Sequence, residues 1–337
     1  MGAAQIALLL VVVATATSAD AVTLRATPAT VQAVLCGASG GDTVTLSPGQ
    51  YANIRLSNAT FRPALQIDAR AATLVGAAFT GVTGVEIVGG EFRLPPPRMA
   101  KDGKTSIYEA AIRINGSTMV RVTGARFTGP GGDGSSPEAP FGDGYGVYAR
   151  NSRQVEVTES RLAGLKTGIV IMAVDGFNIS GNRFSGMRSD GINVAESRNG
   201  RLHENECRST RIREGEHPDC IQMWSRSTSA PTSDVSIRLN SIRGHTQGIG
   251  LFNHKRNGVD DGGFDRIVIE ENDIEVSYPH AIAMTDARDS VVRNNKVRTL
   301  SGAKYRASIN LLGGHVGRCG NTISAWAGKP PTTDKDC

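Results

Sequence analysis

Four residues of the sequence could carry acid–base chemistry, because their types and their spacing repeat. His217 and Asp219 stand just before the apolar phrase Cys-Ile-Gln-Met, and His245 holds the matching place before the phrase Gly-Ile-Gly-Leu. The ordinary pKa of an imidazole lies near working pH, so these histidines could take or give a proton. Arg188 holds the same place one phrase earlier and could neutralise an anion. The sequence therefore predicts His217, Asp219, His245 and Arg188 as catalytic residues, with turn residues that only cap backbone amides as the alternative.

These residues lie at turns that precede seven similar strand phrases. Side chains alternate between the two faces of a strand, so the first apolar residue of each phrase points inward and the next residue outward. If the phrases stack as parallel strands about 4.8 Å apart, the residues of one column become neighbours. The predicted inward column is Val147, Ile169, Ile192, Ile221, Ile249, Ile282 and Ile309, and the predicted outward column is Tyr148, Val170, Asn193, Gln222, Gly250, Ala283 and Asn310.

Further side chains around the same turns are predicted to contact a substrate. An exposed Trp224 could act as a platform for a sugar ring, although the ring could instead pack under the insertion that precedes its strand. The basic loop after the His245 strand should overhang the same face, where lysine and arginine could pair with carboxylates. The predicted substrate-binding residues are Lys166, Lys255, Arg256, Asn193, Gln222, Trp224, Tyr148 and Asp190.

A recurring asparagine indicates how the phrases are stacked. Five similar phrases place an asparagine in one column at steps of 23, 35, 32 and 23 residues, namely Asn182, Asn205, Asn240, Asn272 and Asn295. Self-similarity with a period near 23 residues is typical of stacked coils. A stacked asparagine column is also what a ladder of side-chain amides needs. Many short Val, Ile and Thr runs between turn residues then predict an all-β protein built as one continuous solenoid.

The beginning of this solenoid resembles the cap of a known fold. Residues 27–40 have an early proline and helical spacing, and residues 41–52 read as a strand, a turn and a second strand. A short helix followed by Gly-Asp-Thr-Val-Thr-Leu-Ser-Pro-Gly-Gln-Tyr resembles the N-terminal cap of right-handed parallel β-helix proteins of the pectate lyase-like superfamily. The phrase His-Pro-Asp-Cys-Ile-Gln-Met-Trp at 217–224 resembles a signature of secreted bacterial β-helix proteins thought to act on polysaccharides. The resemblance spans about residues 41–314 and implies a right-handed parallel β-helix with a short capping helix.

The first residues resemble a secretory signal peptide. An apolar run at residues 6–15 precedes a small-residue site at Ala19 and Ala21, and the run is too short to span a membrane comfortably. We expect a signal peptide at residues 1–21, a cap at 22–41, coils at 42–315 and a tail at 316–337. The mature chain would begin near Asp20 or Val22 and be secreted or periplasmic. A buried first strand is the alternative.

Cysteine positions fit export. One pair brackets an insertion and another brackets the tail, so each could form a disulfide in an oxidising compartment. These pairs are Cys207 with Cys220 and Cys319 with Cys337. Five free thiols are the alternative. Cys36 is expected to be a small buried residue of the first helix.

The sequence indicates no required cofactor and no zinc site. Asp260 and Asp261 with flanking glycines could bind Ca²⁺, and a solvated loop tip is the alternative. The formal net charge of +5 weakly favours an acidic ligand. No basic and aromatic stripe for nucleic acid appears, and a capped solenoid that buries its own core predicts a monomer without membrane insertion.

These residues best suit β-elimination of an acidic, uronate-containing polysaccharide. The reaction needs a group that neutralises the C6 carboxylate, a base for the C5 proton and an acid for the leaving O4. The neutralising candidates are Lys166, Arg188 and Arg256, the base candidates are His217 and His245, and Asp219 would orient a histidine. A C5-epimerase would use the same proton abstraction.

Two other functions are also compatible with these residues. Asp190 and Asp219 occupy one column in adjacent coils, where two carboxyls roughly 5 Å apart would allow retaining hydrolysis and 6.5–9.5 Å inverting hydrolysis. A non-catalytic carbohydrate-binding solenoid would instead depend on Trp224 and Tyr148.

Overall fold

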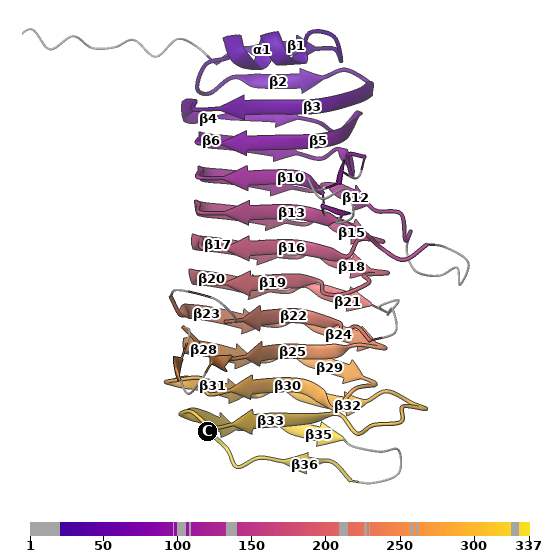
Figure 1. Ribbon diagram of the computed structural model, residues 1–337, viewed down its shortest axis with the longest axis vertical. Helices are drawn as coiled ribbons and strands as arrows, with labels where there is room; N and C mark the ends of the chain where they lie inside the picture. The colour runs from indigo at the N-terminus through magenta and orange to yellow at the C-terminus, as the bar shows by residue number, and fades with distance from the viewer. Residues whose placement is uncertain are drawn as a thin grey trace, which may run out of the picture.

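A stack of parallel coils forms an elongated solenoid, with the helix α1 (Val31–Gly37) at one end and the C-terminus at the other (Figure 1). The computed structural model describes residues 21–96, 98–99, 106–107, 109–132, 140–208, 215–225, 228, 230–256, 259–260, 262–324 and 330–337, with the backbone alone at 98–99, 106–107, 256 and 259–260. The expected signal peptide therefore lies almost wholly outside the described residues. Within the described ranges, no helix has the length and apolar character needed to cross a membrane.

Each central coil contributes one strand to each of three faces. The back face is a 12-stranded parallel sheet. Its strands are β1 (Thr23–Ala26), β2 (Thr43–Leu46), β4 (Thr60–Asp68), β6 (Thr83–Val88), β11 (Thr118–Thr123), β14 (Arg153–Thr158), β17 (Asp175–Ser180), β20 (Arg198–His203), β23 (Thr232–Arg238), β28 (Phe264–Glu270), β31 (Ser290–Arg293) and β34 (Val316–Cys319).

The front face points toward the viewer in Figure 1, and the side face lies to its right. The front strands are β3 (Gly49–Ser57), β5 (Ala72–Thr80), β10 (Ala110–Asn115), β13 (Tyr145–Arg150), β16 (Thr167–Met172), β19 (Ile192–Ala195), β22 (Asp219–Trp224), β25 (Gln247–Phe252), β30 (His280–Thr285) and β33 (Ser308–Leu312). The side strands are β7 (Glu91–Arg93), β12 (Arg126–Thr128), β15 (Arg161–Ala163), β18 (Arg183–Ser185), β21 (Glu206–Arg208), β24 (Ser241–Gly244), β29 (Asp273–Val276), β32 (Lys296–Thr299) and β35 (Thr322–Ser324).

The remaining strands are short and antiparallel. They are β8 (Arg98–Met99) with β9 (Ser106–Ile107), β26 (Lys255–Arg256) with β27 (Val259–Asp260), and β36 (Thr332–Thr333) against β35. Because β34 and β35 still pair in parallel with the preceding coil, the coil pattern extends past residue 315 to residue 324. The all-β prediction with a short N-terminal helix is confirmed.

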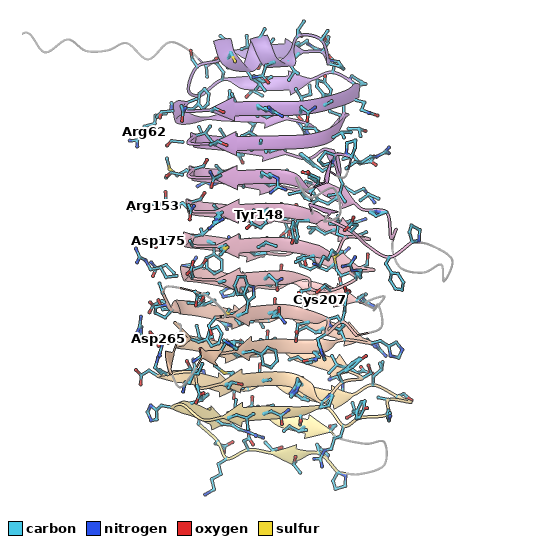
Figure 2. All side chains as sticks on the ribbon, viewed as in Figure 1. Arg62, Tyr148, Arg153, Asp175, Cys207 and Asp265 are labelled. Carbon is cyan, nitrogen blue, oxygen red and sulfur yellow. A yellow bond between two sulfur atoms is a disulfide. The ribbon has the colours of Figure 1, made fainter. Side chains whose placement is uncertain are left out.

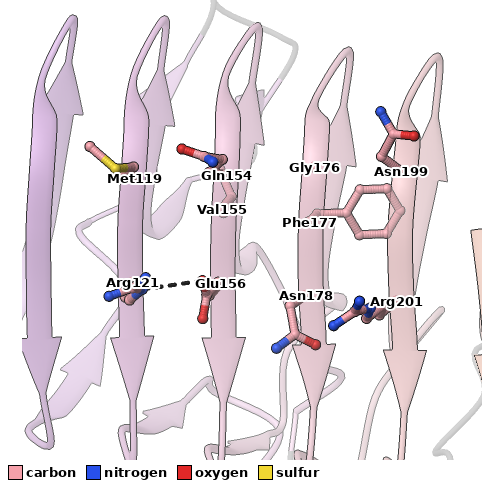
Figure 3. Close-up of a pocket in the computed structure, with 10 residues that line it drawn as sticks. All are labelled: Met119, Arg121, Gln154, Val155, Glu156, Gly176, Phe177, Asn178, Asn199 and Arg201. Carbon is pink, nitrogen blue, oxygen red and sulfur yellow. Dashed lines mark hydrogen bonds and ion pairs between the residues drawn. The ribbon is translucent and has the colours of Figure 1, made fainter.

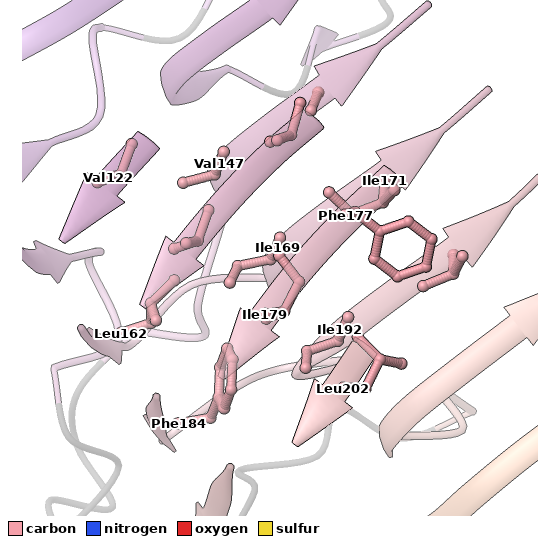
Figure 4. Packing of buried hydrophobic residues seen from close by; sticks show 14 of the residues in the cluster. Val122, Val147, Leu162, Ile169, Ile171, Phe177, Ile179, Phe184, Ile192 and Leu202 are labelled. Atoms are coloured by element: carbon pink, nitrogen blue, oxygen red, sulfur yellow. The ribbon is translucent and has the colours of Figure 1, made fainter. Parts of the chain in front are cut away.

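The predicted register is confirmed along the front face. Every neighbouring pair of the inward column is a strand partner, from Val147 with Ile169 to Ile282 with Ile309, and no member is more than 6% exposed. Figure 4 shows Val147, Ile169 and Ile192 beside apolar side chains from the other two faces, such as Ile179 and Phe184. One local difference occurs at β30, where the register shifts and His280 pairs with Ser308 instead of Ala307.

The asparagine column forms the predicted amide ladder between the back and side faces. The backbone N–H and the side-chain amide of Asn205 both donate to the Oδ1 of Asn240, at 2.9 and 3.1 Å, and the same pattern repeats from coil to coil. Asn321 continues the column, although the repeat phrases did not include it. These side chains are at most 1% exposed, so the ladder satisfies buried polar groups that the turns would otherwise leave unpaired.

Both predicted disulfides are present, Cys207 with Cys220 and Cys319 with Cys337. The first joins β21 to β22 and closes the insertion at whose end Asp219 lies. The expectation for Cys36 is wrong, because its side chain is exposed. Val31 and Leu35 form the buried stripe of α1, and Cys36 follows Leu35 onto the solvent side of this short helix.

Candidate functional site

A polar stripe runs along the front face, where the turns from the side face enter the front strands. We define the front-face stripe by Tyr145, Tyr148, Lys166, Asp190, Asn193, His217, Asp219, Gln222 and His280. Strand pairing brings successive members together, because Tyr148, Val170, Asn193 and Gln222 are register partners in turn. Asp219 is likewise the partner of Gln247. Strand pairing therefore places polar residues of successive coils side by side, although they lie 22 to 29 positions apart in the sequence.

Two buried carboxyls lie at the centre of the stripe. Asp190 is 3% exposed and Asp219 is not exposed, and the backbone N–H of Asp219 donates to Asp190 Oδ1 at 3.0 Å. Ser189 Oγ donates to Asp190 Oδ2 at 2.9 Å, and Gln222 Nε2 donates to Asp219 Oδ2 at 3.1 Å. Both side chains are therefore anchored within the protein.

Burial shifts the protonation of this pair toward the neutral form. Desolvation raises the pKa of Asp190 to about 6, although hydrogen bonds and the charge of Lys166 act in the opposite direction. Desolvation, followed by the negative charge of Asp190, raises the pKa of Asp219 well above its ordinary value. Both carboxyls therefore keep a proton to higher pH than an exposed aspartate does.

Asp219 does not orient a histidine, so that part of the prediction is wrong. Its Oδ2 is occupied by Gln222, and its Oδ1 has no hydrogen-bond partner among the described residues. A Cβ atom at Gly250 would lie 2.9 Å from Asp219 Oδ1 and 2.5 Å from Phe252 Cε2. The absence of a side chain at Gly250 therefore leaves the space that the Asp219 carboxyl and the Phe252 ring occupy.

His217 and His245 lie in adjacent turns and are both exposed. The backbone N–H of Gln247 and the hydroxyl of Thr246 both donate to the carbonyl oxygen of Pro218, at 2.8 and 3.0 Å. The turn that carries His245 is therefore packed against the turn that carries His217. The structure brings both predicted histidines to one end of the front strands.

His280 lies near these histidines, although it was not among the residues predicted from the sequence. Burial and the charge of His217 both lower the pKa of His280, and its ring lies 6.0 Å from the Phe252 ring. Asn310 Nδ2 lies 3.4 Å from the carbonyl oxygen of Pro279, which can only accept, and 3.0 Å from His280 Nδ1. Nδ1 therefore accepts, and the neutral ring carries its proton on Nε2. Its place in the column of Asp190 and Asp219 was the signal that could have identified it.

The predicted cations fall into two groups. Lys166 is half-buried and close enough for its charge to lower the pKa of Asp190. Arg188 is 8% exposed, and its guanidinium donates to Glu216 at 3.0 Å and to the carbonyl oxygen of Gly142 at 3.4 Å. Arg188 thus holds two turns together, and its contact with a substrate remains a prediction.

The described part of the basic loop lies away from the histidine turns. It leaves the opposite end of β25, where Asn253 and the backbone of His254 bind Ser225 Oγ and Lys255 pairs with Asp286 at 3.0 Å. The predicted overhang of Lys255 above the stripe is therefore not observed. The side chains of Arg256, Asp260 and Asp261 lie outside the described residues, and so does the expected Ca²⁺ site.

The predicted aromatic contacts lie at separate places on the front face. Tyr148 is half-buried near the centre of this face (Figure 2), with the Tyr145 ring at 5.6 Å and the Arg113 guanidinium 5.7 Å from its centroid. Trp224 is also half-buried, but it ends β22 beside Phe252, at the far end of the strand from His217. In the part of the chain that the structure describes, no group of three or more His, Cys, Asp or Glu side chains is placed to hold a metal ion.

Several solved structures share this fold. The Dettilon tailspike protein aligns with a TM-score of 0.58 and 14% identity, covering 87% of this chain and 56% of the tailspike chain. An alginate lyase complex aligns with a TM-score of 0.53 and 18% identity, over 90% of this chain and 65% of the lyase chain. The A-module of a mannuronan C-5 epimerase from Azotobacter vinelandii aligns with a TM-score of 0.52 and 14% identity, over 82% and 72% of the two chains. The chain thus spans less than two thirds of the tailspike and lyase chains.

Sequence comparison gives the same fold. No curated protein matches the chain in sequence. The family model described as the right handed beta helix region matches residues 110–297, more than half of the chain. The parallel coils, the three faces and the amide ladder agree with that match, and the predicted pectate lyase-like fold is confirmed. This chain belongs to the right-handed β-helix family.

Proposed function

We propose that the chain is a polysaccharide lyase that cleaves a uronate-containing polymer by β-elimination at the front-face stripe. This proposal rests on the exposure of the titratable side chains, because a polymer can contact only those that reach the surface. His217 is exposed and His280, Tyr148 and Lys166 are half-buried, whereas Asp190 and Asp219 are 3% and 0% exposed. β-Elimination requires a cation, a base and an acid, and the accessible groups are of these kinds.

The roles follow from the charge and tautomer of each group. Lys166 would pair with the C6 carboxylate of the uronate, which makes the adjacent C5 proton easier to remove. His217 would take that proton, a C4–C5 double bond would form, and the C4–O4 bond would break. The imidazolium of His217 would then give that proton to the leaving O4, and His280, whose Nδ1 is held as an acceptor by Asn310, would donate its Nε2–H to the substrate as a hydrogen bond. The step consumes no water and needs no oxidant.

The fold and its covalent links support this assignment without specifying it. An alginate lyase and a mannuronan C-5 epimerase share the architecture, and both names refer to acidic polysaccharides. Two disulfides favour an oxidising compartment, so secretion or a periplasmic location belongs to the proposal. A monomer that binds its polymer along the solenoid also belongs to it.

Hydrolysis is the second candidate, and the adjacent carboxyls are the observation that favours it. A raised pKa suits a general acid, and Asp219 has one. However, hydrolysis needs both carboxyls to reach the glycosidic bond or its water. Their burial beneath Gln222 and Ser189 therefore favours elimination, with Asp190 and Asp219 supporting the surface groups.

The test is the ultraviolet absorbance of the unsaturated product during incubation with alginate, polygalacturonate and a neutral glucan. A lyase raises the absorbance with an acidic polymer and leaves the neutral one unchanged. New reducing ends without absorbance would establish hydrolysis and overturn the proposal. Exchange of the C5 proton with deuterated solvent, without chain cleavage, would instead identify an epimerase.

A further inference from the structure

The side face contains a groove lined by a column of exposed arginines. The groove has a volume of about 560 Å³ and is formed by β12, β15, β18 and β21. Arg126, Arg161 and Arg183 are register partners in three successive coils and are all exposed. The three guanidinium-bearing strands are therefore separated by the parallel strand spacing of about 4.8 Å.

This arginine column is flanked by one glutamate at each end, Glu91 and Glu206, which are the register partners of Arg126 and Arg183. Among the described residues, Arg126 and Arg161 have no ion-pair partner, and Arg183 shares Glu206 with Arg208. Four guanidinium groups of the groove thus share one carboxylate. Like charges directly opposite one another on neighbouring strands are destabilising. This arrangement therefore lowers the stability of the protein when no anion is bound.

Other parts of the solenoid show the usual solution. Further along the side face, Arg243 pairs with Glu275 at 3.5 Å, and Arg298 pairs with Asp273 at 2.5 Å. On the back face, Figure 3 shows Arg121 paired with Glu156 of the next coil, at 3.1 Å. These three arginines are therefore neutralised by carboxylates across coils, whereas Arg126 and Arg161 are not.

The second outward column of the same strands gives the groove its depth. Thr128, Ala163 and Ser185 are short side chains beside the long arginines. Phe127 and Phe184, which also line the groove, are buried to within 2% exposure and serve as its floor. Among the described lining residues, no aromatic face is therefore exposed for stacking with a nucleic acid base or a sugar ring.

We infer that this groove binds an extended polyanionic carbohydrate through its carboxylates, separately from the front-face stripe. An arginine fork pairs with a carboxylate through two hydrogen bonds, and an in-register column suits a polymer with one carboxylate on each successive sugar. The absence of a stacking surface among the described lining residues favours such a polymer over single-stranded nucleic acid. The turns after β15 and β18 carry Lys166 and Asp190, so the groove and the stripe belong to the same coils. The choice of a uronate polymer rests on the proposed function, whereas the anion-binding groove does not.

The first test measures polymer binding by a double variant and a matched control. Arg126→Gln/Arg161→Gln removes two groove charges, and Arg243→Gln/Arg298→Gln removes two paired charges from the same face. Both are made in a His217→Ala background, so that the polygalacturonate probe stays intact. We expect the groove variant to weaken binding about tenfold at low salt and the control to stay within about twofold. Equal weakening by both variants would overturn the inference, because net charge alone would explain it.

The second test locates the contact. Phenylglyoxal modifies accessible arginines, and mass spectrometry identifies the modified positions. Polygalacturonate should protect Arg126 and Arg161 but leave Arg243 reactive. Protection by a single-stranded oligonucleotide in place of the polyuronate, or no protection at all, would overturn the inference. Protection in a protein that shows no lyase activity would uphold the groove and reject the proposed function, and activity without protection would do the reverse.

Discussion

Two polar columns run along this solenoid at different turns, and they differ in how completely their atoms are paired. Between the back and side faces, the asparagine column is a closed network, in which Asn240 accepts from Asn205 and donates to Asn272 and to the carbonyl oxygen of Leu202. Between the side and front faces, the column of Asp190, Asp219 and Gln247 leaves buried oxygens of Asp219 and Gln247 without partners among the described residues. The first column repeats one residue type, whereas the second changes from coil to coil.

The comparison teaches how structural and functional polar residues can be separated in a repeat protein. A buried polar side chain that donates and accepts in every coil stabilises the stack and does no chemistry. Buried carboxyls with raised pKa values in neighbouring coils are destabilising at neutral pH, and such groups cluster at functional sites. Substitution in the asparagine column should therefore lower stability, whereas substitution of a buried carboxyl should raise stability at neutral pH.

The largest expected effect is on activity at the front-face stripe. His217→Ala should lower kcat/KM on an acidic polymer by about 10²–10⁴-fold, the usual contribution of a general base. Its thermal midpoint should match that of the wild type, because the side chain is exposed. His315→Ala is the control, since the His315 side chain is 89% exposed and lies in the last coils. If activity survives in His217→Ala and is lost in His280→Ala, the base has been misassigned.

The second effect is on stability at the asparagine column. Asn240→Ala removes the acceptor of two Asn205 donors and leaves them buried, so unfolding should become about 3 kcal/mol easier. Urea unfolding gives the value. Asn178→Ala is the matched control, because this residue faces outward from β17 and should change stability by less than about 0.5 kcal/mol. Similar losses in both variants would show that the ladder is no more stabilising than a surface amide.

The disulfides extend the comparison to covalent links. Replacing Cys207 and Cys220 by alanine should cost about 2–4 kcal/mol of stability, and it should also reduce activity because Cys220 directly follows Asp219. The disulfide between Cys319 and Cys337 lies outside the stripe. Replacing both cysteines by alanine should therefore lower stability and leave activity unchanged. Activity assays and urea unfolding on both double variants distinguish the two cases. Equal activity in both would separate the first disulfide from the stripe.

The smallest effect is a pH dependence of stability. The pKa of folded Asp190 is about 6, above its ordinary value of 3.8, so the folded protein binds more protons than the unfolded chain between these values. The stability contributed by the protonated pair is complete below about pH 3.8 and is lost as pH rises through about 6. Asp219→Asn removes one of the coupled carboxyls and should raise the urea midpoint relative to the wild type at pH 8, with a smaller difference at pH 5.

Asp175→Asn provides the opposite case. Arg198 and Asn199 lower the pKa of Asp175, so its contribution is present above its ordinary pKa and is lost in acid. This variant should be less stable than the wild type at pH 8. A lower midpoint for Asp219→Asn at pH 8 as well would mean that the buried pair is stabilising, and the contrast between the columns would fail.

Much of the fold could be predicted because it depends on local rules. Strand alternation identified Val147 and Ile169 as inward-facing, and the repeat identified Asn205 and Asn240 as neighbours despite 35 intervening steps of sequence. Both disulfide pairs followed from their positions around an insertion and the tail. The candidate site was predicted only in outline, since column positions selected Asp219 and His217 but not the partner of either side chain.

The sequence by itself determined the coil repeat, the inward column and the turns at which polar residues gather, because a period of two along each strand and a recurring coil leave few alternatives. Only the tertiary structure decided what the side chains at those turns contact. Asp219 accepts a hydrogen bond from Gln222 and lies beside Gly250 instead of a histidine. Lys255 forms an ion pair with Asp286. Such contacts depend on the direction and size of side chains supplied by a neighbouring coil, about thirty residues away, which no local pattern specifies.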